Sequence, residues 1–225
     1  MKLNVPLALA LHCLLLAFPS LAAKPSAADI PPLEEPECPD TFLGGYGPFD
    51  YSDPARRRDS LPVVETYHFN SDVAALKRGV SGTLGSDLDY TIRAFPNHHR
   101  ALDALSRYGQ KLHSQQPPGT QCTIDGFFRR AVRMAPGDAT LHMVYGIHLT
   151  RWGHPREALA EFKAAEKLSP DDPNILYNLG LGYFEQKDYE NARIAAVKAY
   201  EKGFPPSITG LKDKLIKAGK WSSAG

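Results

Sequence analysis

Two consecutive stretches in the C-terminal half of the chain decide the fold: DATLHMVYGIHLTRWGHPREALAEFKAAEKLSPDD, residues 138–172, and DPNILYNLGLGYFEQKDYENARIAAVKAYEKGFPP, residues 172–206. When the first stretch is shifted by 34 positions, small and apolar residues of the two stretches coincide. The coinciding pairs are Gly146 with Gly180, Leu149 with Tyr183, Ala158 with Ala192, Phe162 with Ala196 and Ala165 with Ala199. Self-similarity at a fixed period of about 20 to 50 residues indicates a repeat architecture.

The spacing of these residues has a physical reason. Small side chains at Gly146 and Ala158 let two antiparallel helices of one repeat approach closely, whereas Phe162 and Leu149 fill the space between neighbouring repeats. One such helix pair cannot bury its own apolar face, so about three or more must stack. Two clear copies are too few, and the sequence therefore predicts further copies upstream.

The pattern resembles the tetratricopeptide repeat, which also carries a proline near the end of each unit, as Pro170 does here. The resemblance is strong for repeats at residues 139–172 and 173–206. It implies an all-α fold, a tetratricopeptide-type array of helical hairpins (an α-solenoid) over residues 70–204, with degenerate repeats at 70–96 and 97–137. In the degenerate copy at 97–137, the insertion HSQQPPGTQ at residues 113–121 lengthens the turn between the two helices.

Both ends of the array need a cover. In residues 205–225, Leu211, Leu215 and Ile216 form one apolar stripe opposite several lysines, which predicts a C-terminal capping helix and tail. Residues 41–69 begin with TFLGGYGPFDY, which is too apolar for a solvated linker and too rich in turn residues for a helix. We expect an irregular N-terminal strap that packs on the helices, with Arg56–Arg58 in an exposed turn followed by a strand or more extended chain.

The N-terminus has the layout of a secretory signal. One lysine precedes an apolar run over residues 5–18, and a helix-breaking Pro19 and a small Ala22 follow. Residues 1–22 are therefore predicted to be a signal peptide, and residues 23–40 a proline-rich linker. A transmembrane anchor is the alternative, but the run falls short of the roughly 20 residues that a spanning helix needs. The protein is expected to be periplasmic or secreted, with no stable membrane anchor after cleavage.

The composition and the cysteine content agree with an exported protein. The chain has 225 residues, 43% hydrophobic and 23% charged, with a net charge of +1, so it carries no electrostatic signature of a nucleic-acid partner. Beyond the signal only Cys38 and Cys122 remain, and in an oxidising compartment such a pair favours a disulfide. Two buried thiols are the alternative.

No motif for chemistry is present. The sequence lacks a glycine-rich phosphate loop, a nucleophile elbow and a paired-cysteine or HExxH motif, so we expect neither an enzyme nor a cofactor. A metal site could be assembled across repeats from the histidines, but their spacing does not put two ligands on one helix face. We expect them to be polar residues of the surface or groove; they are His98, His99, His113, His142, His148 and His154.

The resemblance implies a ligand in the concave groove formed by the first helix of each repeat. The residues carried over to that groove are Arg100, Arg107, Lys111, Met143, Ile147, Arg151, Asn174, Tyr177, Asn178, Leu181, Phe184 and Glu185. This groove would be basic at one end and apolar and aromatic at the other. In some relatives lysines and asparagines bind a C-terminal carboxylate, but Met143 and Ile147 stand where two of them are needed. An extended or helical peptide with apolar anchors fits better. Alternatively, Met143, Ile147 and Leu181 pack only against a neighbouring helix or the strap.

The sequence therefore predicts an exported interaction module or scaffold that binds a peptide or protein partner. Two other functions stay open: a periplasmic protein that binds metal through its histidines, and a structural assembly component of the cell envelope.

Overall fold

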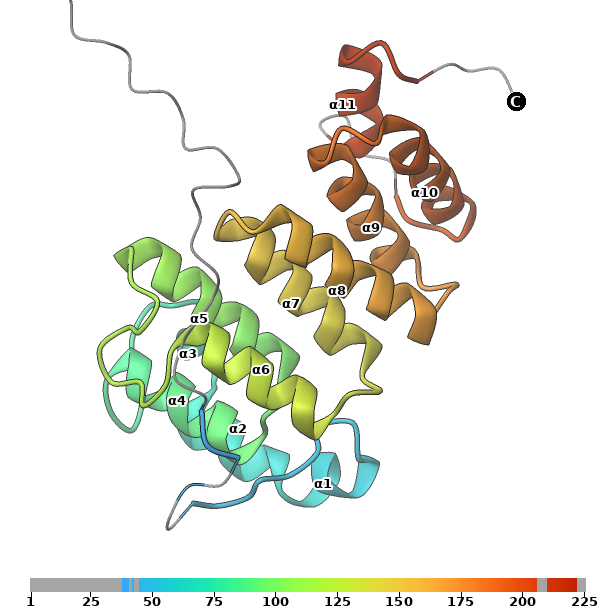
Figure 1. Cartoon of the computed structure of the whole chain (residues 1–225). Coiled ribbons are helices and arrows are strands. Elements are labelled where there is room, and N and C mark those ends of the chain that lie inside the picture. The colour runs from blue at the N-terminus through green and yellow to red at the C-terminus, as the bar shows by residue number, and fades with distance from the viewer. Residues whose placement is uncertain (1–37, 41, 43–44, 206–209, 222–225) are drawn as a thin grey trace, which may run out of the picture. The chain divides into compact units, whose positions relative to one another are not determined.

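The computed structural model describes residues 38–40, 42, 45–205 and 210–221, all within one compact unit, residues 32–225 (Figure 1). The predicted signal peptide and most of the linker lie outside the described residues. The helices are α1 (Pro54–Asp59), α2 (Leu61–His68), α3 (Ser71–Ala74), α4 (Leu84–Ala94), α5 (His99–Leu112), α6 (Ile124–Met134), α7 (Ala139–Arg151), α8 (Pro155–Leu168), α9 (Pro173–Glu185), α10 (Tyr189–Glu201) and α11 (Leu211–Lys217). The described residues contain no strand. None of their helices combines the length and apolar character needed to cross a bilayer.

The helices pack as consecutive hairpins (Figure 1). α2 contacts α4, α5 contacts α6, α7 contacts α8, and α9 contacts α10. Neighbouring hairpins meet through α4 with α5, α5 with α7, and α8 with α9, while α11 packs on α9 and α10. The prediction of an all-α array of helical hairpins is confirmed.

Local sequence explains where the hairpins of the two clear repeats begin. Asp138 caps α7 by accepting a hydrogen bond from the Leu141 backbone N–H at 3.0 Å. Asp172 caps α9 in the same way, and Pro173 follows at the first helical position. An aspartate before the first turn satisfies backbone N–H groups that have no partner in the helix, and proline at the first position lacks one. The capping residues Asp138 and Asp172 are separated by the repeat period of 34 residues.

The close approach of the helices depends on two glycines that face one aromatic ring. A Cβ atom at Gly146 in α7 would lie 2.5 Å from Cε1 of Phe162 in α8, and one at Gly182 in α9 would lie 2.9 Å from Cδ2 of the same ring. Opposite edges of the Phe162 ring thus contact the backbones of two different hairpins. Phe162 is buried and joins the two clear repeats.

Gly146→Leu is therefore expected to destabilise the protein by about 1 to 3 kcal/mol or more, because the larger side chain forces the buried Phe162 ring from its site. Urea unfolding followed by circular dichroism measures the change. The matched control is Gly137→Leu, since a Cβ atom at Gly137 meets nothing within 4 Å. Equal stability of the two variants would contradict this packing.

The N-terminal part differs from the prediction in two ways. Residues 54–59 and 61–68 form α1 and α2, not an exposed turn and extended chain, because Asp53 caps α1 and a proline occupies the first turn of each helix. The start of the degenerate repeat expected at residues 70–96 is also shorter than a repeat helix: α3 ends at Ala74, and Leu76 adopts a left-handed conformation with φ 56°. α2 therefore supplies the first helix of the first hairpin.

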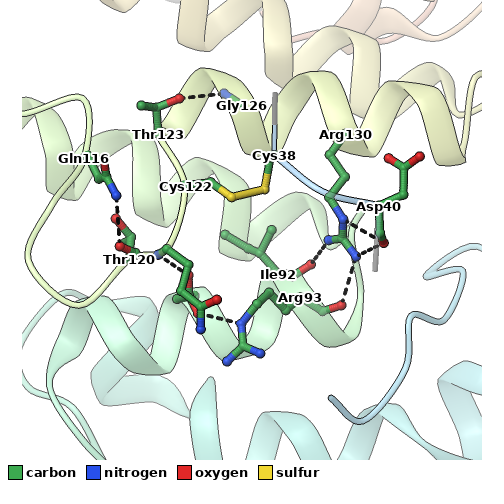
Figure 2. The surroundings of a disulfide bond; sticks show 12 residues. Cys38, Asp40, Ile92, Arg93, Gln116, Thr120, Cys122, Thr123, Gly126 and Arg130 are labelled. Atoms are coloured by element: carbon green, nitrogen blue, oxygen red, sulfur yellow. Dashed lines mark hydrogen bonds and ion pairs between the residues drawn. A yellow bond between two sulfur atoms is a disulfide. The ribbon is translucent and has the colours of Figure 1, made fainter. Parts of the chain in front are cut away.

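The described residues before α1 (38–40, 42 and 45–51), which include the start of the strap, are held against α4 and α6 (Figure 2). Cys38 forms a disulfide with Cys122, just before α6. The buried Arg130 of α6 donates to the Asp40 carbonyl oxygen at 2.8 Å and to the Ile92 carbonyl oxygen at 3.1 Å, and its guanidinium lies 5.0 Å from the ring of Phe42. Burial lowers the pKa of Arg130 to about 10, so the group stays charged at neutral pH.

Further along, the strap follows the end of α4. Phe49 donates its backbone N–H to the Ala94 carbonyl at 2.8 Å, and Tyr51 donates to Oδ1 of Asn97 at 2.8 Å. Gly47 lies directly against the Ala94 backbone with φ 104°, a conformation and an approach that a side chain would obstruct.

The Cys38–Cys122 disulfide should contribute strongly to the stability of the chain that precedes α1. Its two cysteines are 84 residues apart, for which the loss of chain entropy in the unfolded state corresponds to about 4.5 kcal/mol. We expect Cys38→Ser to lower the melting temperature and to expose the chain near Gly45 to protease. Thermal scans and limited proteolysis check this. Reduction should reproduce the effect in the parent and leave the double variant Cys38→Ser/Cys122→Ser unchanged; strap protection that is insensitive to reduction would contradict it.

Candidate functional site

A hollow of about 250 Å³ lies between the first helices of the two clear repeats. Its lining residues are Ile147, Thr150 and Arg151 from α7, Phe162 from α8, and Asn178 and Leu181 from α9. Ile147, Phe162 and Leu181 make the surface apolar, and the other three place polar groups beside it. Of the groove residues predicted from sequence, the structure brings Ile147, Arg151, Asn178 and Leu181 together here. Phe162 and Thr150 complete the set.

The polar side of the hollow is organised around Asp103 of α5. Arg151 donates from Nη2 to Asp103 Oδ1 at 3.1 Å, and Arg107 donates from Nε to Asp103 Oδ2 at 2.8 Å. Two guanidinium groups therefore share one carboxylate, and a net positive charge remains. At the end of the groove predicted to be basic, Arg107 is thus paired and Arg100 lies 3.8 Å from Glu65. Lys111 remains exposed at the end of α5.

Hydrogen bonds through the buried Ser106 and His148 fix the position of Arg151. Arg151 Nη1 donates to Ser106 Oγ at 2.6 Å, and Ser106 Oγ lies 2.9 Å from Nδ1 of His148. Burial, together with the nearby Arg151, lowers the pKa of His148 to about 3, so the ring is neutral. Because Ser106 accepts from Arg151, its proton points to Nδ1. Ser106 and His148 are both buried, so this pair positions Arg151 and presents no nucleophile to solvent.

The aromatic residues predicted at the other end of the groove are partly buried against α11. The Tyr177 ring stacks on Phe204 at 3.9 Å, and its hydroxyl accepts from the Leu211 backbone N–H at 3.1 Å. Phe184 packs beside Tyr189, with Lys214 of α11 over its ring at 5.5 Å. These contacts leave only part of each ring accessible.

Three other predicted groove residues lie outside the hollow. Met143 is partly buried against the core, which agrees with the packing alternative. Asn174 is exposed at the start of α9, where its carbonyl accepts from Asn178 Nδ2 at 2.9 Å. Glu185 is exposed at the other end of α9, 3.7 Å from Lys214.

The histidines are buried more deeply than expected. His98, His142, His148 and His154 are buried, so their assignment to the surface or groove is wrong. Each of three histidines contacts one carboxylate: His98 with Glu65 at 3.1 Å, His99 with Asp138 at 2.7 Å, and His142 with Glu161 at 2.6 Å. In the described part of the chain, no group of three or more His, Cys, Asp or Glu residues is placed to hold a metal. His113 is exposed, as predicted. Arg56–Arg58 are exposed as well, although they lie on α1.

Part of the chain is similar in sequence to a described family. Residues 146–208 match the tetratricopeptide repeat family. No curated protein matches the sequence. Among solved structures, one titled "MamA MSR-1 C2" is 18% identical, covers 53% of this chain and 65% of its own, and superposes with a TM-score of 0.40. Another, of a mutant of MamA, is 16% identical, covers 64% of this chain and 96% of its own, with a TM-score of 0.38. The chain thus spans about two thirds of the first of these structures.

The buried His148 predicts an acid sensitivity. A histidine with an ordinary pKa of about 6.5 in the unfolded chain and about 3 in the fold binds its proton first in the unfolded state. Its contribution to stability is present above pH 6.5 and is lost as the pH falls toward 3. Between pH 7 and 5 this amounts to roughly 2 kcal/mol. His148→Gln should therefore show a flatter stability curve in urea titrations over this range.

The control for this titration is His113→Gln, which changes an exposed histidine. Its stability should fall with acid as steeply as that of the parent. A parental slope in His148→Gln would mean that another group dominates the acid response.

Proposed function

We propose that this chain is an exported module for protein–protein interaction, and that it binds a peptide segment of its partner in the hollow between α7 and α9. The observation that carries the proposal is the combination of an apolar floor, Ile147, Phe162 and Leu181, with polar groups beside it on the first helices of two consecutive repeats. In tetratricopeptide repeats this is the side on which ligands usually lie, and residues 146–208 match that family.

The hollow suits one side chain of a peptide. It has a volume of about 250 Å³ and is open to solvent. It has room for an apolar side chain of a longer ligand, which would pack between Ile147 and Leu181. Peptide backbone groups then need polar partners, and Asn178 and Thr150 stand at the margin to supply them.

The contacts of Arg151 favour a ligand that need not be acidic. Its guanidinium is bound by Asp103 and Ser106, so part of its positive charge is offset and its hydrogen-bond donors are partly occupied. An acidic ligand group would have to compete with Asp103 for it. We therefore propose that the affinity comes from apolar anchors and that Arg151 orients polar groups of the ligand.

Export is proposed on the sequence layout of residues 1–22. The Cys38–Cys122 disulfide supports it, because such bonds persist in oxidising compartments and are rare in the cytosol. Secretion of a fusion of residues 1–40 to a reporter enzyme tests this separately from binding.

Binding is tested with residues 23–225, on which 12-residue peptides are selected from a random library and then titrated by fluorescence anisotropy. Ile147→Lys should weaken the selected peptides by about tenfold or more, because a charge on the floor of the hollow opposes an apolar anchor. The control Leu168→Lys changes a 44% exposed side chain elsewhere and should bind as the parent does. Circular dichroism verifies that both variants are folded. Peptides that bind Ile147→Lys unchanged would place the site elsewhere.

A further inference from the structure

A second hollow, of about 480 Å³, lies at the N-terminal end of the described structure. Its lining residues are Tyr46 from the strap, Val63, Val64, Tyr67 and His68 from α2, Ser81 from the following loop, and Tyr90 from α4. We call this set the tyrosine patch. It contains three tyrosines and two valines, and no Lys, Arg, Asp or Glu side chain. The interaction proposed for α7 and α9 uses none of these residues.

The tyrosine patch exposes more apolar surface than a surface helix requires. Tyr67 is 59% exposed and Val63 is 51% exposed, and Tyr46 and the neighbouring Val80 are exposed as well. Single exposed apolar side chains are ordinary, but a contiguous group marks an interaction surface. Large aromatic side chains are also the residues that contribute most to binding interfaces.

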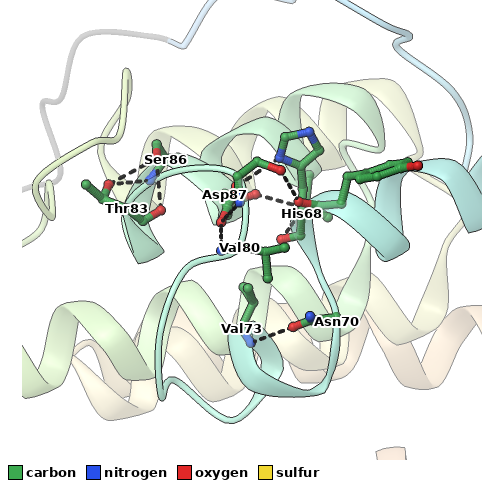
Figure 3. A network of polar contacts seen from close by, with 10 residues as sticks. His68, Asn70, Val73, Val80, Thr83, Ser86 and Asp87 are labelled. Atoms are coloured by element: carbon green, nitrogen blue, oxygen red, sulfur yellow. Dashed lines mark hydrogen bonds and ion pairs between the residues drawn. The ribbon is translucent and has the colours of Figure 1, made fainter.

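A polar network holds this surface in shape (Figure 3). The His68 ring stacks on Tyr90 at 3.9 Å, and its Nδ1 lies 2.9 Å from Oδ1 of the buried Asp87. The other carboxylate oxygen of Asp87 accepts from the Val80 backbone N–H at 2.6 Å. Ser81 Oγ donates to the Tyr67 carbonyl at 2.6 Å, which fixes the loop to the end of α2. A ligand therefore meets a preorganised surface, which lowers the entropic cost of binding.

Arg56 places a positive charge beside the patch. It lies over the Phe49 ring at 5.1 Å, and Phe49 contacts Tyr46 edge to face at 4.9 Å. The carboxylates near Arg56 already have partners: Asp50 accepts from Ser52 and Asn97, and Asp53 caps α1. Further along the chain, Asp59 pairs with Arg58, Glu65 contacts His98, and Asp87 contacts His68.

We propose that the tyrosine patch binds an extended, proline-rich segment of a partner protein that carries acidic residues beside its prolines. Proline rings pack flat on tyrosine rings, and an extended polyproline helix has no internal hydrogen bonds, so its carbonyls accept from tyrosine hydroxyls. Such a segment is already stiff and loses little entropy on binding. Carboxylates at its edge meet Arg56, which selects an acidic segment over a basic one.

The probe is a fluorescent peptide of sequence EPPLPPEPPLPE, titrated by anisotropy against residues 23–225. We expect saturable binding that a peptide with alanine in place of every proline does not show. Tyr67→Ser should weaken binding about tenfold or more. The control Leu168→Ser changes a comparably exposed apolar side chain outside the patch and should leave binding unchanged. Arg56→Glu should weaken the acidic peptide and strengthen its counterpart KPPLPPKPPLPK.

Each other outcome overturns the proposal. Absence of binding, equal binding of the alanine peptide, or equal loss in Tyr67→Ser and Leu168→Ser excludes recognition of proline at this surface. If sedimentation shows that the protein self-associates and Tyr67→Ser abolishes the association, the patch is an interface between copies. The variant Ile147→Lys separates the two sites, because it should leave this peptide bound while weakening the ligands of the α7 and α9 hollow.

Discussion

The contact between the Phe162 ring and two glycine backbones is the constraint on which the C-terminal half depends. Gly146 and Gly182 belong to different hairpins, and opposite edges of one buried ring fill the space that their missing side chains leave. The same ring forms the floor of the hollow between α7 and α9. One side chain thus sets the distance between two repeats and also lines the hollow between them.

The N-terminal half is held by a different kind of interaction. Arg130 is buried, and its guanidinium is satisfied by carbonyl oxygens of Asp40 in the strap and of Ile92 and Arg93 near the end of α4. A buried cation without such acceptors would be strongly destabilising. The strap is therefore part of the hydrogen bonding of the helical core, and the Cys38–Cys122 disulfide keeps it there. By anchoring the strap, these contacts also position Tyr46 at the margin of the tyrosine patch.

The polar groups in the interior serve mainly to orient other groups. Asp103 pairs with both Arg107 and Arg151, and the hydrogen bonds through Ser106 and His148 fix the position of Arg151. Asp87 binds both His68 and the backbone of the loop at Val80. Each of these side chains is hydrogen-bonded, as buried polar groups must be to avoid a large desolvation cost. Their effect is to present two preformed hollows, one apolar with polar groups at its margin and one aromatic with a cation beside it.

The sequence by itself determined the architecture, because helix formation and close packing leave local signals. Small residues spaced by 34 positions indicate helical hairpins, and the aspartates and prolines before α7 and α9 mark their starts. It also identified Ile147, Arg151, Asn178 and Leu181 as residues of one surface, since Ile147 and Leu181 lie at equivalent positions of adjacent repeats and the other two lie one helical turn away on the same helices. Local turn and cap signals for α1 and α2 were present at Asp53, Pro54 and Pro62, but the aromatic and glycine-rich chain before them masked their helical character.

What only the tertiary structure decided is which of these side chains remain open to a ligand. Tyr177 is partly covered because the backbone of Leu211, 34 residues away, bonds to its hydroxyl. Arg151 pairs with Asp103 across 48 residues, and Arg130 donates to Asp40 across 90. The histidines are buried for the same reason. Exposure, charge and protonation depend on neighbours that folding brings from distant positions, and a repeat period carries no information about those neighbours.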